Sequence, residues 1–154
     1  MTFSISRKHE VYNIYIKTSI KPPRRADALA IYIAEYISDN APDKPATLTC
    51  QFELPETTET AIVLTALIKA LDRLTKPCEV CIFTDAKSVF ANLESRKYEI
   101  WKAQKWRGTS EIIKNYELWE ILSGQLAKHK WTVTDNEHSY SNWMKDELRK
   151  WQKA

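Results

Sequence analysis

Asp85 is the residue of this sequence best placed to do chemistry. It follows an apolar run expected to form a strand, Cys78 to Thr84, and precedes a helix-like stretch, Ala86 to Leu93. Open α/β sheets gather their ligands at the C-terminal ends of central strands, so a carboxylate at this point is expected to line a metal or phosphate site. The alternative role for Asp85 is to cap the helix that follows, and one residue can serve both purposes.

A second candidate feature is the segment 95–114, which combines positive charge with tryptophans. The whole chain has a net charge of +3. The segment alone holds six cations against two acidic residues: Arg96, Lys97, Lys102, Lys105, Arg107 and Lys114. Trp101 and Trp106 lie among them, and cations with aromatic rings suit a sugar-phosphate backbone. The alternative is a solvated helical face with its tryptophans turned inward, which we expect for Trp119.

Other kinds of site find little support. The three cysteines are an odd number in a chain with no export signal, so free thiols are expected. Cys78 and Cys81 form a CxxC, but an odd spacing in a strand sends them to opposite faces. There is no glycine-rich phosphate loop, nucleophile elbow or HExxH.

The elements that would position these residues follow from the apolar periodicity. Strands are expected over 11–18, 28–37 and 46–54, with turns at 21–25 and 40–45. A helix capped by Thr57 or Thr58 follows and ends before Lys76-Pro77. After the Asp85 strand come helices from about 86, from about 98 and over 115–128, a strand over 130–134, and a last helix capped by Ser139 or Ser141. This order predicts an α/β fold with a mixed sheet covered by helices.

Length and composition set the frame for this fold. At 154 residues, 44% of them hydrophobic, the chain is the size of one domain, which we place at residues 1–154. It contains no run of about 18 to 20 apolar residues and no basic, apolar signal sequence at its start. We therefore expect a cytoplasmic protein that does not bind membranes and acts as a monomer, with a protein partner as the alternative.

Three stretches carry a family resemblance: "KPCEVCIFTDAKSVFANL", "IWKAQKWRG" followed by "KNYELWEIL", and "NWMKDEL". They resemble ribonuclease H, the metal-dependent nuclease that cuts the RNA strand of RNA/DNA hybrids. The first stretch is similar to the strand-Asp-helix segment of that family. The second is similar to its basic, tryptophan-bearing handle, and the third to its last helix. The resemblance covers nearly the whole chain and implies a five-stranded mixed sheet in the order 3-2-1-4-5, flanked by helices.

The family's chemistry uses four carboxylates around two divalent ions. The resemblance places Asp85 and Asp146 at two of these positions, but Lys17 at the first-strand Asp and Val63 at the helix Glu. An ammonium at position 17 puts a positive charge where the ions would lie. We therefore expect no metal cofactor; Mg or Mn, held by Asp85 and Asp146, is implied only if the protein is an active nuclease. Glu59, one turn before Val63, is the substitute acid in that case.

The resemblance also assigns a nucleic-acid surface. Its members are Trp101, Lys102, Lys105, Trp106, Arg107, Lys114 and Asn115. Lys114 and Asn115 match a polar pair that opens the next helix, where exposed amides favour an anion. The family's loop histidine falls at Asn136, with His138 nearby as a substitute.

Three functions remain open from the sequence. The first is a binding module for RNA/DNA hybrid or double-stranded RNA that has lost efficient hydrolysis, in which Lys17 lies between Asp85 and Asp146 and replaces the metals by an internal salt bridge. The second is a working nuclease that uses Asp85, Asp146 and Glu59. The third is a protein-interaction scaffold on the same fold.

Overall fold

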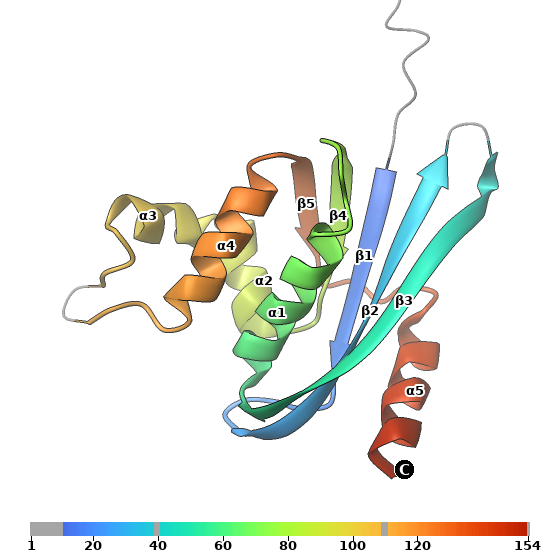
Figure 1. The fold of residues 1–154 in the computed structure, drawn as a ribbon, viewed down its shortest axis with the longest axis horizontal. Helices are drawn as coiled ribbons and strands as arrows, with labels where there is room; N and C mark the ends of the chain where they lie inside the picture. The colour runs from blue at the N-terminus through green and yellow to red at the C-terminus, as the bar shows by residue number, and fades with distance from the viewer. Residues whose placement is uncertain (1–10, 39–40, 109–110, 154) are drawn as a thin grey trace, which may run out of the picture.

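A five-stranded mixed sheet forms the centre of the fold (Figure 1). The structure is a computed structural model that describes residues 11–38, 41–108 and 111–153. The strands are β1 (Val11–Thr18), β2 (Ala26–Ser38), β3 (Ala41–Thr57), β4 (Glu79–Phe83) and β5 (Lys130–Thr134). The helices are α1 (Glu59–Leu71), α2 (Lys87–Glu94), α3 (Lys97–Ala103), α4 (Tyr116–Leu126) and α5 (Ser141–Lys153).

The strands lie in the order β3-β2-β1-β4-β5, which confirms the predicted topology. The first three form an antiparallel meander, because short connections can reverse the chain but cannot cross over. β4 runs parallel to both β1 and β5, and α1 supplies the crossover from β3 to β4. The C-terminal ends of β1, β4 and β5 therefore meet at one end of the sheet.

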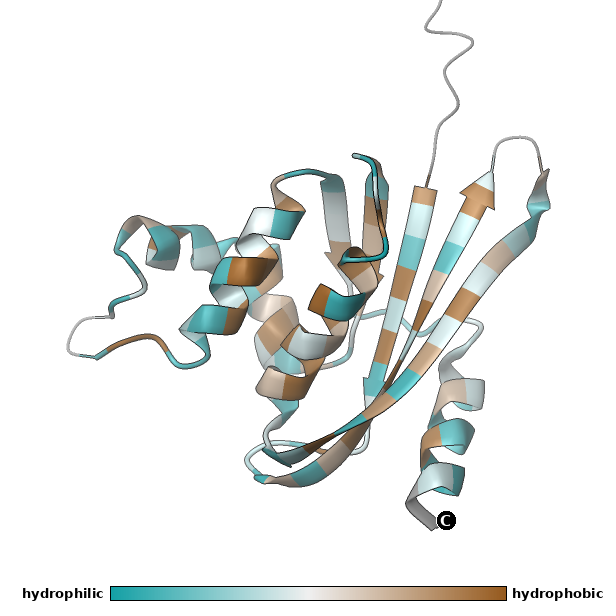
Figure 2. Cartoon of the chain, viewed as in Figure 1, coloured by the Kyte–Doolittle hydropathy of each residue, from teal (hydrophilic) through white to brown (hydrophobic). Residues whose placement is uncertain are grey.

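Each face of the sheet has its own hydrophobic cluster. Alternation along β1 sends Ile14 and Ile16 to the cluster that α1, α2 and α4 cover, and Tyr15 to the cluster that α5 covers. Figure 2 shows the same alternation as bands of opposite hydropathy along the strands. On the α5 side, Met144 and Leu148 pack against the sheet. Lys17, two residues after Tyr15, faces this second side.

Local sequence signals set some boundaries correctly. Thr58 caps α1: its side chain accepts a hydrogen bond from the Ala61 amide at 3.3 Å, as predicted for one of the two threonines. Residue 40 of the predicted turn at 40–45 lies outside the described residues, and the rest of the prediction is wrong, because residues 41–45 belong to β3. Pro42 and Pro45 are tolerated there because β3 is an edge strand. On its outer side no neighbouring strand requires a backbone N–H donor, which proline lacks.

Among the described residues, the helices are all too short or too polar to cross a membrane.

Candidate functional site

The centre of the candidate site is an ion pair between Lys17 and Asp85. Tyr15 of β1 and Phe83 of β4 are the last cross-strand partners of these parallel strands. Lys17 and Asp85 each follow two residues later, Lys17 still on β1 and Asp85 just beyond β4. Lys17 Nζ lies 2.9 Å from Asp85 Oδ2. The lysine side chain is 7% exposed and the aspartate side chain 45% exposed. A nearly buried ammonium is thus held by a carboxylate that water can also reach.

The turn after β4 directs Asp85 toward this pair. The Thr84 amide donates to the Thr134 carbonyl at 3.1 Å, which extends the pairing of β4 with β5 by one residue. The Thr84 hydroxyl then accepts from the Ala86 amide at 3.2 Å. Ala86, and not Asp85, is the residue that precedes α2 at its cap position. The capping role considered for Asp85 is therefore not adopted, and its carboxylate bonds to Lys17.

On α1, Glu59 rather than Val63 is the side chain that interacts with Asp85. Glu59 is 8% exposed, and burial followed by the negative charge of Asp85 raises the pKa of its carboxyl, with Lys21 partly offsetting the rise. Val63 lies in the hydrophobic cluster under α1. The two residues are one turn apart on the same helical face, and Glu59 is the one whose carboxyl interacts with Asp85.

The segment after β5 closes the site, and it adds one residue, Glu137, that the sequence analysis did not single out. Asn136, Glu137 and His138 line a small cavity with Lys17 and Asp85, of about 10 Å³, which is room for about one water. Proximity to the Ser141 hydroxyl, then the positive charges of Lys17 and Lys145, lower the pKa of Glu137. No motif marked Glu137, because it lies in a connection whose path is fixed only by the fold.

His138 packs into the site by its ring. Its centroid lies 4.3 Å from that of Tyr15 and 5.4 Å from that of Phe83, and its Nδ1 accepts a hydrogen bond from the Tyr140 amide at 3.2 Å. Burial, and then the charge of Lys17, lower the pKa of the imidazole. His138 is therefore the histidine at the site, in keeping with its proposed substitution for Asn136.

Asp146 has a different environment from the one expected. It is exposed and pairs with Arg149 at 2.9 Å, one turn further along α5. Met144 and Leu148 face the sheet. Asp146 is two positions from each of them along α5, which is about 200° around the helix, so it faces away from the sheet. The expectation that Lys17 lies between Asp85 and Asp146 is thus met for Asp85 and wrong for Asp146.

A buried carboxylate, Glu35, fixes the segment that carries Glu137 and His138. Glu35 lies on β2 and accepts hydrogen bonds from Asn13 at 2.9 Å, from Tyr15 at 2.8 Å and from Tyr140. Burial opposes its ionisation, but the hydrogen bonds from Asn13, Tyr140 and Tyr15 outweigh burial and lower the pKa of Glu35. The hydrogen bond to Glu35 and, to a smaller extent, burial raise the pKa of Tyr140 to about 12. Tyr140 is thereby tied to the sheet two residues after His138.

These side chains do not fit the paired dications of the resembling family. The ammonium of Lys17 occupies one oxygen of Asp85. Within the part of the chain that the structure describes, no group of three or more His, Cys, Asp or Glu side chains is arranged to hold a metal ion. The arrangement is that of a salt bridge with nearby acids, and we derive no metal-dependent step from it.

The basic segment lies beyond the sheet, and we call its described part the handle: α3 with residues 104–108 and 111–115. Its predicted cations, Lys102, Lys105, Arg107 and Lys114, are all exposed. Trp101 is half-buried, with its ring 5.8 Å from that of Trp119 and the Lys97 ammonium 5.7 Å from its centroid. Trp119 is a core residue, as predicted.

Trp106 corrects the sequence interpretation of the handle. It was predicted to contact nucleic acid, but it is only 6% exposed and belongs to the main hydrophobic cluster. The backbone turns it inward: Lys105 and Trp106 both have left-handed φ angles, 56° and 64°. The Trp106 carbonyl accepts from the Ile113 amide at 2.8 Å, which closes the connection to α4. Asn115, half-buried, directly precedes α4, as predicted.

The chain is similar in sequence to known proteins of one family. The RNase H family model matches residues 9–150. Ribonuclease H of Janthinobacterium sp. (strain Marseille) is 36% identical over 89 residues, which are 54% of this chain and 61% of the relative. Ribonuclease H of Legionella pneumophila (strain Lens) is 36% identical over 76 residues, 49% of this chain and 52% of the relative. The chain thus spans a little over half the length of these relatives.

Solved structures show the same fold at low identity. LC9-RNase H1, described as a type 1 RNase H with the type 2 active-site motif, superposes with a TM-score of 0.74 at 16% identity, covering 92% of this chain and 72% of the other. The foamy viral protease-reverse transcriptase in complex with RNA/DNA hybrid gives 0.63 at 13% identity, over 96% of this chain and 20% of the other.

Proposed function

Because this chain belongs to the RNase H family, we propose that it binds RNA/DNA hybrid or double-stranded RNA and has lost efficient hydrolysis. The observation that carries the proposal is the 2.9 Å pair between Lys17 and Asp85. A carboxylate at position 17 would attract dications, whereas a buried ammonium repels them and neutralises Asp85.

The handle supports the binding part of the proposal. Lys102, Lys105 and Arg107 are exposed around the half-buried Trp101, so their charges are available to phosphates and the exposed part of the Trp101 side chain to sugar or base. Lys114 and Asn115 precede α4, whose first amides add a further anion-binding point. Such contacts follow the shape of a duplex rather than its sequence, because phosphates and 2′-hydroxyls carry no base identity.

We assign the family's acidic helix position to Glu59 and not to Val63, on the strength of its interaction with Asp85. Two acids of the original site, Glu59 and Asp85, then remain, with Glu137 nearby and Lys17 as the main departure. Asp146, exposed and paired with Arg149, is kept as the counterpart of the last-helix Asp by its sequence context only.

A short fluorescent RNA/DNA hybrid tests both halves of the proposal. Binding that weakens steeply as salt rises, without RNA cleavage in the presence of Mg or Mn, is the expected result. Cleavage that is abolished by Asp85→Asn would overturn the loss of hydrolysis. Failure to bind hybrid and double-stranded RNA at low salt would overturn the binding function and favour a protein-interaction scaffold.

A working nuclease is the second candidate, and one observation favours it. Glu59 and Asp85 are close enough that the charge of Asp85 raises the pKa of Glu59, as expected of acids that await a cation. In that case Lys17 must leave Asp85 when substrate binds. Cleavage by the wild-type protein that is lost in Glu59→Gln as well as in Asp85→Asn would establish this candidate.

A further inference from the structure

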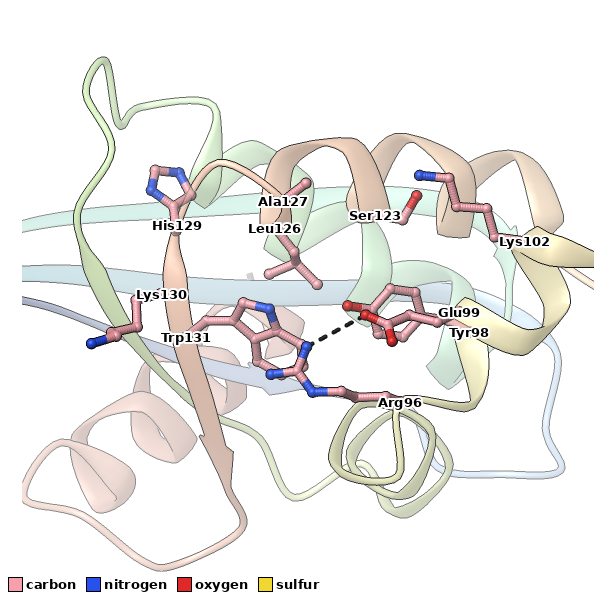
Figure 3. A pocket seen from close by; sticks show the side chains of 10 residues that line it. All are labelled: Arg96, Tyr98, Glu99, Lys102, Ser123, Leu126, Ala127, His129, Lys130 and Trp131. Carbon is pink, nitrogen blue, oxygen red and sulfur yellow. Dashed lines mark hydrogen bonds and ion pairs between the residues drawn. The ribbon is translucent and has the colours of Figure 1, made fainter.

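A second pocket lies at the opposite end of the sheet from Lys17 and Asp85. It has a volume of about 380 Å³ and is bordered by α3, the end of α4 and the start of β5 (Figure 3). β5 runs parallel to β4, so the start of β5 at Lys130 is remote from the strand ends that carry the ion pair. This volume is within the range of small-molecule sites, about 300 to 1,000 Å³.

The pocket has an apolar floor. Tyr98, Leu126 and Trp131 are buried members of the main hydrophobic cluster and border the cavity. Figure 3 shows the Tyr98 and Trp131 rings directed toward each other below the end of α4. A ligand that enters the pocket therefore meets aromatic and aliphatic atoms on one side, which suits a flat, weakly polar group.

The polar groups of the pocket are mainly donors. Arg96, Lys102 and Lys130 are cations, while Glu99 is the single carboxylate among the lining residues and pairs with Arg96 at 3.5 Å. The pKa of His129 is lowered by burial and, to a smaller extent, by the charge of Lys128. The Nδ1 atom of His129 accepts a hydrogen bond from the Cys78 amide at 3.2 Å. Its other nitrogen consequently carries the proton. An acceptor-rich, negatively charged group such as phosphate fits this set.

Arg96 gives the pocket its distinctive geometry. Its guanidinium carbon lies 4.4 Å from the Trp131 ring centroid, yet half of the side chain, 50%, remains exposed. One face of the guanidinium is thus covered by an indole and the other is open for a second flat group. Arg96 reaches this position with a φ of 58°, a left-handed conformation that arginine rarely adopts and that often marks functional positions.

We propose that this pocket binds a nucleoside monophosphate. The base stacks on the open face of the Arg96 guanidinium, and the phosphate accepts from Lys102 and from the edge of Arg96, displacing the long, exposed contact with Glu99. The pocket and the handle share α3, but Arg96 precedes α3 and is not among the residues assigned to duplex binding, so its substitution tests nucleotide binding alone. Lys102 borders both surfaces, and Arg96 is therefore the residue that discriminates between them.

AMP titrated into the ¹⁵N-labelled full chain tests the proposal by NMR. We expect saturable shifts of the Arg96 amide and the Trp131 indole N–H, and affinity for inorganic phosphate alone at least about tenfold weaker, because phosphate lacks the stacking group. The proposal would be overturned by the absence of a saturable shift. Shifts confined to the surroundings of Lys17 and Asp85, or to the part of the handle that follows Lys102, would also overturn it.

Two substitutions of Arg96 and one control sharpen the test. Arg96→Gly removes the side chain while favouring the left-handed backbone, and should weaken AMP binding about tenfold or more. Arg96→Lys keeps the charge but loses the flat face, so AMP affinity should fall toward that of phosphate. Lys44→Ala removes one charge from an exposed position on β3 and should leave binding within about twofold. Equal AMP affinity in wild type and both Arg96 variants would refute the site.

Discussion

Lys17 and Asp85 form an asymmetric pair: the lysine side chain is 7% exposed and the aspartate 45% exposed across a 2.9 Å contact. If the pair is broken, Asp85 can turn to water, but the ammonium of Lys17 stays among protein atoms. Loss of the pair is therefore more costly for Lys17 than for Asp85, and removing Asp85 should destabilise the protein more than removing Lys17.

Asp85→Asn should destabilise the protein by about 2 to 3 kcal/mol, because it leaves the Lys17 ammonium buried without its counter-charge. Urea unfolding measures this. Asp146→Asn is the matched control: its pair with Arg149 is exposed on both sides, so we expect a change of at most about 0.5 kcal/mol. A more stable Asp85→Asn variant would mean that repulsion among acids, and not the pair with Lys17, dominates the site.

Lys17→Asp should create affinity for Mg or Mn. The change replaces a cation by a carboxylate beside Asp85, with Glu59 and Glu137 nearby, so negative charges must then be offset by a bound cation. Calorimetry checks the binding, and a hybrid cleavage assay shows whether hydrolysis returns. Lys17→Asn, which removes the ammonium without adding a charge, is the control and should bind these ions far more weakly. Equal affinities in the two variants would show that position 17 does not decide metal binding.

Lys105→Ala should weaken hybrid binding and lower the slope of log affinity against log salt by about 0.9, the effect of one lost phosphate contact. Fluorescence anisotropy at several salt concentrations measures both quantities. Lys44→Ala, a change of equal charge on β3, should alter neither. If both variants shift the slope equally, binding reflects net charge rather than the handle.

Trp106→Ala should unfold or strongly destabilise the protein, by about 3 to 5 kcal/mol, since it empties a large volume in the main hydrophobic cluster. Trp101→Ala, at a half-buried position, should cost less stability but reduce hybrid affinity. Thermal unfolding and anisotropy separate the two effects. A stable Trp106→Ala variant with lost affinity would restore Trp106 to the binding surface.

His138 should make stability depend on pH. Its pKa in the folded state lies below the ordinary value of 6.5, so in the window beneath 6.5 the unfolded chain binds more protons. The free energy of unfolding should therefore be highest above pH 6.5 and fall as the pH drops through the lowered pKa. His138→Phe keeps an aromatic ring against Tyr15 but cannot titrate. Urea unfolding between pH 7.5 and 5 should show a shallower fall in this variant; an equal fall would assign it to other groups.

Local patterns predicted the helices and strands of the mixed sheet, whereas the order of its strands was predicted from the family resemblance. Alternating apolar residues, a capped helix and an apolar strand before the acid determine the order of elements, because each is encoded within a few neighbouring residues. The extent of β3 was not predicted, since its prolines read as a turn and become acceptable only at an edge that the tertiary fold creates.

The errors within the site arise from side-chain direction. Glu59 and Val63 lie on one helical face, so the resemblance that placed Val63 at the acidic position did not show that Glu59 is the residue beside Asp85. Trp106 points inward because consecutive left-handed residues reverse the chain, which no propensity of lysine or tryptophan foretells. Asp146 matches a motif, but the packing of Met144 and Leu148 sets the rotation of α5 and carries it to the outside.

The hydrogen bonds of Glu35 join residues from both ends of the folded chain, with Asn13 and Tyr15 on β1 and Tyr140 just before α5. Detaching the C-terminal helix would remove one donor from this ionised group and uncover the apolar side of the sheet at the same time. We therefore expect α5 and the β1–β2 pair to open together, with similar protection of their amides from hydrogen exchange and with proteolysis of α5 chiefly in molecules where this pair has also opened.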